Sequence, residues 1–103
     1  MNVQEALTTI AEGWHDTIEP SLKEQKYGIA HNDLQNLSLA ARAHVQEFAR
    51  YHHGIRWMAH VQLLKDALQD RNEKNIQDYT VKVQIYFAQL CLSVQTDNTF
   101  QTK

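Results

Sequence analysis

Apolar residues recur at steps of three and four through the first part of the chain, which is the spacing of one helix face. Asn2 and Glu5 have the separation of a capping box, so this helix is expected to begin there. Pro20 lacks a backbone donor and breaks helices, yet the stripe keeps its phase across it. The pattern predicts either one kinked helix to about Lys26 or a short second piece from Pro20, with Gly28 ending it. The stripe consists of Val3, Leu7, Ile10, Trp14, Ile18 and Leu22.

A second helical stripe starts after Asn32, a capping residue with Gln35 three positions later. It runs through Leu34, Leu37, Ala41, Val45, Phe48 and His52, and a further stripe follows as Ile55, Met58, Val61, Leu64 and Leu68. Gly54 separates the two. If Gly54 is a turn, the chain forms an antiparallel four-helix bundle. If Gly54 is inside a helix, residues 33–71 form one helix, and three long helices are completed by dimerisation. The length of such a helix favours the first alternative.

The last helix is expected from about Lys74 to Val94, after a polar loop at residues 70–75. Its core face is Ile76, Tyr79, Val83, Phe87, Leu90 and Val94, and Val81, Ile85, Tyr86 and Cys91 widen it. A helix that is apolar over so much of its circumference is usually central or at an interface. The interface residues predicted on it are Tyr79, Val83, Tyr86, Phe87 and Leu90. Many β-branched and aromatic residues leave a strand as the alternative for residues 81–94.

Composition supports an all-α fold. Three glycines and one proline in 103 residues are too few for a protein with many sheet turns. The length predicts a single helical domain, residues 1–94, with residues 95–103 as a flexible polar tail. A single cysteine allows no internal disulfide, and neither a signal peptide nor a membrane-spanning apolar run is present in the sequence. These observations predict a cytoplasmic protein that does not enter a membrane.

Charge is unevenly distributed along the chain. Residues 1–33 carry six acids and two lysines, a net charge of -4, whereas residues 34–65 carry four bases and one acid, a net charge of +3. These segments either complement each other, within the fold or across a dimer, or the basic segment binds an anion. The formal net charge of -2 makes a nucleic-acid partner unlikely on electrostatic grounds.

Histidines, which are common metal ligands, cluster in the basic segment. His44, His52, His53 and His60 are separated by seven or eight residues where they share a helix face. Two side chains that hold one ion from adjacent helix turns need a step of three or four. His44 and Glu47 form the single H-x-x-E step, and the chain contains neither H-E-x-x-H nor C-x-x-C. Histidine-based metal binding therefore remains an alternative, and no metal or other cofactor is predicted.

Arginines and aromatic rings alternate with those histidines, which suggests a site for a small anion or a nucleotide. Guanidinium groups bind phosphates, and rings beside them can stack on a base. The candidate ligand-binding residues are Arg50, Tyr51, His53, Arg56, Trp57 and His60. The alternative interpretation places the rings in the core and pairs the arginines with acids of the first helix.

No catalytic constellation is evident. Cys91 lies in an apolar run, and the three serines lack a nucleophile motif. We therefore expect no enzyme and no catalytic residues. The sequence predicts a small cytoplasmic protein-binding module, an adaptor, inhibitor or regulator, that self-associates as a homodimer. An anion or nucleotide sensor is the alternative.

Overall fold

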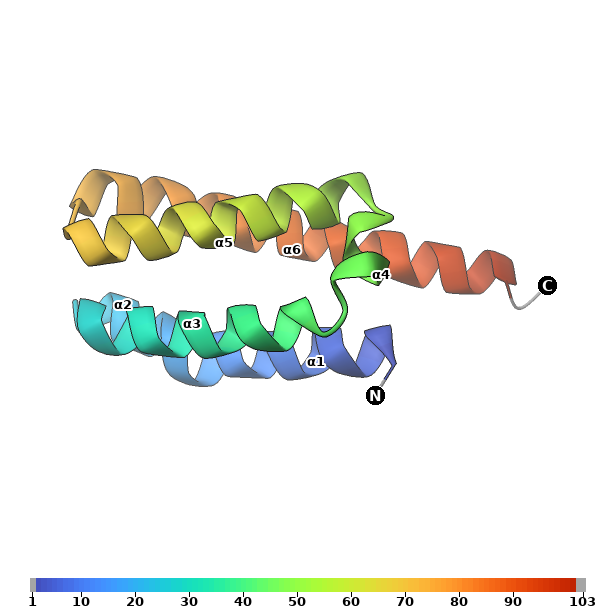
Figure 1. Cartoon of the computed structure of the whole chain (residues 1–103), viewed down its shortest axis with the longest axis horizontal. Helices are drawn as coiled ribbons and strands as arrows, with labels where there is room; N and C mark the ends of the chain where they lie inside the picture. The colour runs from blue at the N-terminus through green and yellow to red at the C-terminus, as the bar shows by residue number, and fades with distance from the viewer. Residues whose placement is uncertain (1, 102–103) are drawn as a thin grey trace.

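The computed structural model describes residues 2–101, and the side chains of residues 2–96. The described residues form helices and turns and no strand. They make a compact, elongated body of 47 × 21 × 19 Å, shown in Figure 1. The all-α prediction is confirmed, and the strand alternative for residues 81–94 is wrong.

The first helical segment is interrupted by a wider turn. It comprises α1 (Val3–Gly13), the π-helix η1 (Trp14–Ile18) and α2 (Glu19–Lys23). The Asn2 side chain accepts a hydrogen bond of 2.8 Å from the backbone N–H of Glu5, so the predicted N-terminal cap is confirmed.

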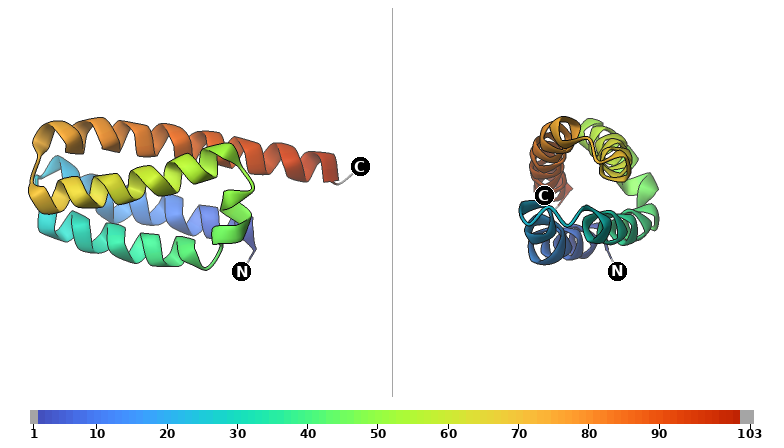
Figure 2. Two further views of the ribbon diagram at one scale, coloured as in Figure 1. Left: turned by 45° about the horizontal axis from the view of Figure 1, so that its top comes forward. Right: turned by 90° about the vertical axis from the view of Figure 1, so that its left-hand side faces the viewer.

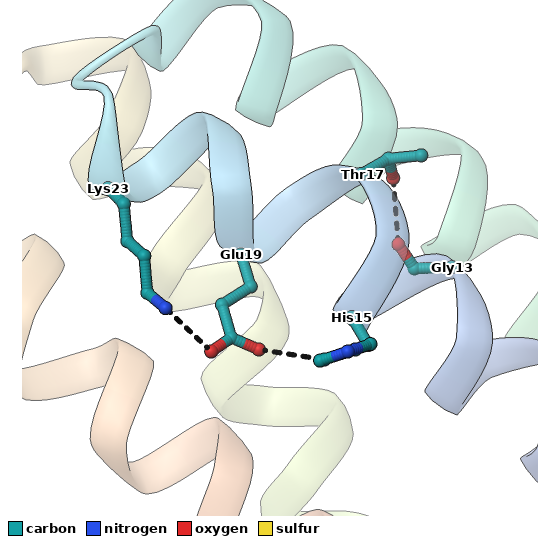
Figure 3. A network of polar contacts seen from close by, with 5 residues as sticks. All are labelled: Gly13, His15, Thr17, Glu19 and Lys23. Atoms are coloured by element: carbon teal, nitrogen blue, oxygen red, sulfur yellow. Dashed lines mark hydrogen bonds and ion pairs between the residues drawn. The ribbon is translucent and has the colours of Figure 1, made fainter.

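Pro20 explains the π-helix. The backbone N–H of Glu19 donates to the carbonyl of Trp14, five residues back. The acceptor is therefore one residue further back than in an α-helix. A proline in a regular α-helix clashes with the carbonyl four residues back, and the wider turn relieves that clash. The Thr17 hydroxyl donates to the Gly13 carbonyl at 2.7 Å, as Figure 3 shows. The chain therefore stays helical through Pro20 but ends this segment at Lys23.

Two tight turns are made by residues other than glycine. Gln25 (φ 59°) follows α2, and Arg71 (φ 54°) follows α5 (His52–Asp70). At both turns the next backbone N–H bonds to the carbonyl five residues back, as in a Schellman motif: Lys26 to Ser21, and Asn72 to Ala67.

The expected boundaries at Gly28 and Asn32 are wrong. Helix α3 (Tyr27–Arg42) begins directly after the first tight turn and contains both residues. The predicted loop at residues 70–75 is also shorter than expected. Asn72 accepts a hydrogen bond from the backbone N–H of Asn75 at 3.2 Å, and α6 (Glu73–Gln101) begins beside it. Because α6 continues past Val94 to Gln101, the flexibility expected for residues 95–103 stays a prediction.

The middle of the chain turns at residues 43–51. Helix α3 ends at Arg42, the short α4 (Val45–Ala49) follows, and α5 then starts at His52. Gly54 lies in the first turn of α5 with a helical backbone, so it is not the turn residue. The alternative of one continuous helix over residues 33–71 is equally wrong.

A close approach of two backbone segments accounts for the glycine at position 54. A Cβ atom there would overlap the carbonyl oxygen of Phe48 and lie 2.8 Å from its carbonyl carbon. It would also lie 3.3 Å from Leu90 Cδ1. Glycine thus lets the start of α5 pack directly on the end of α4.

The long helices lie along a common axis, and successive ones run in opposite directions (Figure 1). The α1–η1–α2 segment lies beside α3, and α5 lies beside α6, with the two pairs stacked as Figure 2 shows. The end of α6 projects beyond the other helices. Trp57 of α5 contacts two other elements in the core. Its ring centroid lies 5.8 Å from that of Phe48 in α4, in an edge-on arrangement, and 5.5 Å from that of Phe87 in α6.

Candidate functional site

The six predicted ligand-binding residues do not form one site. Trp57 is only 2 % exposed and belongs to the core, so it offers no ring face to a ligand. Arg50, Tyr51 and His53 lie at the corner between α4 and α5, whereas Arg56 and His60 lie further along α5. Neighbouring residues on a helix point to different sides, which is why proximity in sequence did not bring these side chains together.

Arg56 and His60 form a small cluster with Tyr86 of α6. The guanidinium carbon of Arg56 lies 5.8 Å from the centroid of the Tyr86 ring, within the range of a cation–π interaction. The His60 ring lies 4.9 Å from the same ring and 6.2 Å from that of Tyr79. His60 Nδ1 is 2.8 Å from the Arg56 carbonyl oxygen, which fixes the orientation of the imidazole. Arg56 is exposed, so this cluster presents a cation and an imidazole at the surface.

The corner residues are arranged differently. Arg50 is exposed, while Tyr51 and His53 are partly buried. The His52 and His53 rings lie 5.7 Å apart, and His53 Nδ1 is shielded from solvent without a hydrogen-bond partner. Among the described residues, no three histidine, cysteine or acidic side chains come close enough to share a metal ion.

The predicted interface residues of α6 face the interior to different extents. Val83 and Leu90 are 2 % and 0 % exposed, so both are core residues of this chain. Tyr79, Tyr86 and Phe87 are partly buried and pack against that core. None of the five is an exposed apolar side chain in this fold.

A separate apolar stripe on α6 is exposed. Val81, Ile85 and Leu92 have exposures of 52 %, 48 % and 62 %. With Ala88 they follow steps of four, three and four residues, so they share one face, and that face is opposite Val83 and Leu90. The apolar pattern of the sequence places Val81 and Ile85 on a widened core face, whereas in the structure they belong to this second stripe, whose spacing is visible in the sequence.

The ion pairs of the described side chains are local. Glu19 lies 3.4 Å from His15 and 3.5 Å from Lys23, as Figure 3 shows, and Lys26 lies 3.2 Å from Glu24. Within the part of the chain that the structure describes, no ion pair joins the acidic first segment to Arg50 or Arg56. The opposite charges of the two segments are therefore not matched by direct ion pairs between their described side chains.

Cys91 is partly buried on α6. Burial disfavours the charged thiolate and raises the pKa of the Cys91 thiol above its ordinary value. The thiol is accordingly protonated at neutral pH, which is the unreactive form.

Among the described residues, no helix has both the length and the apolar character needed to cross a membrane.

Comparison with known proteins adds no functional assignment. Neither a protein-family model, nor a curated protein, nor a solved structure matches this chain.

Proposed function

We propose that this chain is a small protein-binding module of the adaptor or regulator type that acts in the cytoplasm and self-associates as a homodimer. In this proposal its helices form an antiparallel four-helix bundle, which serves as a rigid support for the exposed stripe of α6. The single observation that carries the proposal is that stripe, Val81, Ile85 and Leu92, on a helix whose opposite face is already buried.

The spacing of the stripe suits a second copy of the same helix. Val81, Ile85, Ala88 and Leu92 occupy alternating d and a positions of a heptad pattern. If two copies of α6 packed antiparallel about a twofold axis between Ile85 and Ala88, Val81 would lie opposite the partner's Leu92. Such an interface uses the same patch on both copies, as a twofold dimer requires. The segment is about 16 Å long at 1.5 Å per residue, which supports a weak, reversible dimer.

The test is the molar mass in solution, measured by size-exclusion chromatography with light scattering over a range of concentrations. The wild-type chain should rise from its monomer mass of 12.0 kDa towards twice that value. Ile85→Lys should remain monomeric, because it places a charge in the centre of the apolar contact. Leu39→Lys is the matched control, since Leu39 of α3 is 51 % exposed and lies outside the stripe. A wild-type chain that stays monomeric throughout, or a dimer unaffected by Ile85→Lys, would refute the proposal.

A second candidate function is supported by the cluster of Arg56, His60 and Tyr86. Its exposed guanidinium, held beside a tyrosine ring, has the chemistry to bind a phosphate next to a planar base. A nucleotide at about a hundred times its dissociation constant should stabilise the fold by about 2.7 kcal/mol. Arg56→Gln should abolish the resulting shift in melting temperature, and Arg42→Gln, which changes an exposed arginine of α3, should preserve it. A nucleotide panel that produces no shift would eliminate this candidate.

A further inference from the structure

A pocket opens between α3 and α5, beside the corner that joins them. It has a volume of about 220 Å³, and the residues that line it include Ser38, Arg42, Val45, Met58 and Val61. For comparison, an engineered cavity of about 150 Å³ in another protein binds benzene. The pocket therefore has room for a small organic molecule, such as a single ring with one attached group.

The α4 and α5 sides of the pocket provide an apolar surface. Val61 is 3 % exposed, and Met58 packs against the same core. Val45 of α4 also lines the pocket, although its apolar side chain is 44 % exposed. A ligand with an apolar body would remove part of this surface from water, which is favourable.

The α3 side of the pocket provides two hydrogen-bond donors, Ser38 and Arg42, which are one helix turn apart on the same face. Arg42 is exposed, and among the described residues it has neither an ion pair nor a hydrogen bond. Long helical side chains point back along their helix, which directs Arg42 over the turn of Ser38. The Ser38 hydroxyl also makes no hydrogen bond within the described part of the chain, and its oxygen remains accessible to solvent. A guanidinium beside a free hydroxyl is complementary to a carboxylate.

The charges around the pocket favour an anion. Arg42 is the one charged side chain among the described residues that line it. On the opposite wall, the amide nitrogen of Gln62 donates to the carboxylate of Asp66 at 3.1 Å, and Asp66 itself does not line the pocket. Lys65, the residue before Asp66, has no ion pair among the described side chains and offsets its charge. The positive charge of Arg42 is therefore not neutralised by a neighbour.

We propose that this pocket binds the ionised form of a small monocarboxylic acid with an apolar body. The carboxylate accepts hydrogen bonds from Arg42 and Ser38, and the apolar body packs on Met58 and Val61. This site goes beyond the functions proposed above, because its lining shares no residue with the exposed stripe of α6 or with the cluster around Arg56.

The experiment compares benzoate with benzamide at pH 7.5. The two molecules have nearly the same shape, but only benzoate carries a charge. Met58 reports on the pocket, because the chain contains only two methionines, and their ¹³C-labelled methyl signals can be assigned through Met58→Leu. Benzoate should shift the Met58 signal saturably at millimolar concentrations. It should also bind about 5- to 10-fold more tightly than benzamide, which lacks the interaction of a charged group with Arg42.

Two variants assign the roles of the charge and of the pocket. Arg42→Gln removes the guanidinium from an exposed position, so it should abolish the preference for benzoate. Gln62→Phe fills the pocket from an exposed position on α5 and should weaken both ligands at least tenfold.

Each variant has a matched control at an exposed residue that does not line the pocket. Arg50→Gln, at the end of α4, should keep the preference for benzoate, and Gln77→Phe, on α6, should leave both affinities unchanged. The proposal would be overturned by a Met58 signal that benzoate does not move or by equal affinities of the wild-type chain for the two ligands. A preference for benzoate that persists in Arg42→Gln, or binding that survives Gln62→Phe, would also overturn it.

Discussion

Gly54 shows how a single residue is determined by its neighbours in space. It has no unusual backbone angle, since the two left-handed residues of the described chain are Gln25 and Arg71. Glycine is required because the carbonyl group of Phe48 occupies the place of its side chain. Sequence reasoning treats a glycine between two helical stripes as a turn, whereas here the turn lies just before it.

Gly54→Ala should destabilise the fold by about 1–3 kcal/mol, the cost of overpacking, because the atom it meets belongs to the backbone and cannot rotate away. The free energy of unfolding in urea measures this change. Gly28→Ala is the matched control: Gly28 lies in α3, and apart from its chain neighbours and the nearby backbone of its own helix, no atom lies within 4 Å of its Cβ position. That variant should be neutral or gain up to about 1 kcal/mol through helix propensity. If both alanine variants were equally stable, the close packing of α4 on α5 would be incorrect.

The candidate ligand residues show the same dependence on space. Trp57 and Arg56 are adjacent in sequence, yet one lies in the core and the other is exposed. The partner that gives Arg56 a defined environment is Tyr86, which is thirty residues away on α6. The sequence predicted which residue types would be in this region, but not which of them would share a surface.

At the scale of elements, the turns were predicted less well than the helices. Apolar periodicity located every long helix, but the ends were expected at glycine or asparagine. The structure ends α2 and α5 with Gln25 and Arg71 in the left-handed region, which is less favourable for a residue with a Cβ atom. The bonds of the Schellman motif and the packing of the following helix compensate for this preference.

Gln25→Gly should therefore stabilise the protein, by up to about 1 kcal/mol, because glycine adopts this backbone conformation without steric cost. Thermal and urea unfolding would both report the gain. Gln35→Gly makes the same substitution at an exposed position inside α3 and should destabilise by roughly 0.5–1 kcal/mol. A loss of stability in both variants would contradict the left-handed turn at position 25.

At the scale of the whole molecule, α6 has more apolar surface than one chain buries. Its inner face contributes Val83 and Leu90 to the core, and its outer stripe of Val81, Ile85 and Leu92 stays exposed. The width of this apolar surface predicts an interface from the sequence alone. In the fold, most of the predicted interface residues pack inside the chain, with Val83 and Leu90 in the core. The proposed contact between copies therefore uses the opposite face of α6.

If two copies associate through this stripe, the melting temperature should increase with protein concentration, because association stabilises the folded state by mass action. Differential scanning calorimetry over a roughly hundredfold range of concentration measures this dependence. The slope should vanish in Ile85→Lys and persist in Leu39→Lys. A melting temperature that is independent of concentration in the wild-type chain would argue against a dimer that dissociates on unfolding.

The sequence by itself determined the helical class, the N-terminal cap at Asn2, the approximate position of each long helix and most of the core. These features depend on local periodicity and on contacts within a few residues, which a linear pattern records. Tertiary structure alone decided the role of Gly54, the burial of Trp57, the grouping of Arg56 with Tyr86 and the pocket between α3 and α5. Each of these depends on which side chains from distant parts of the chain meet, and helix packing, rather than spacing along the sequence, selects those contacts.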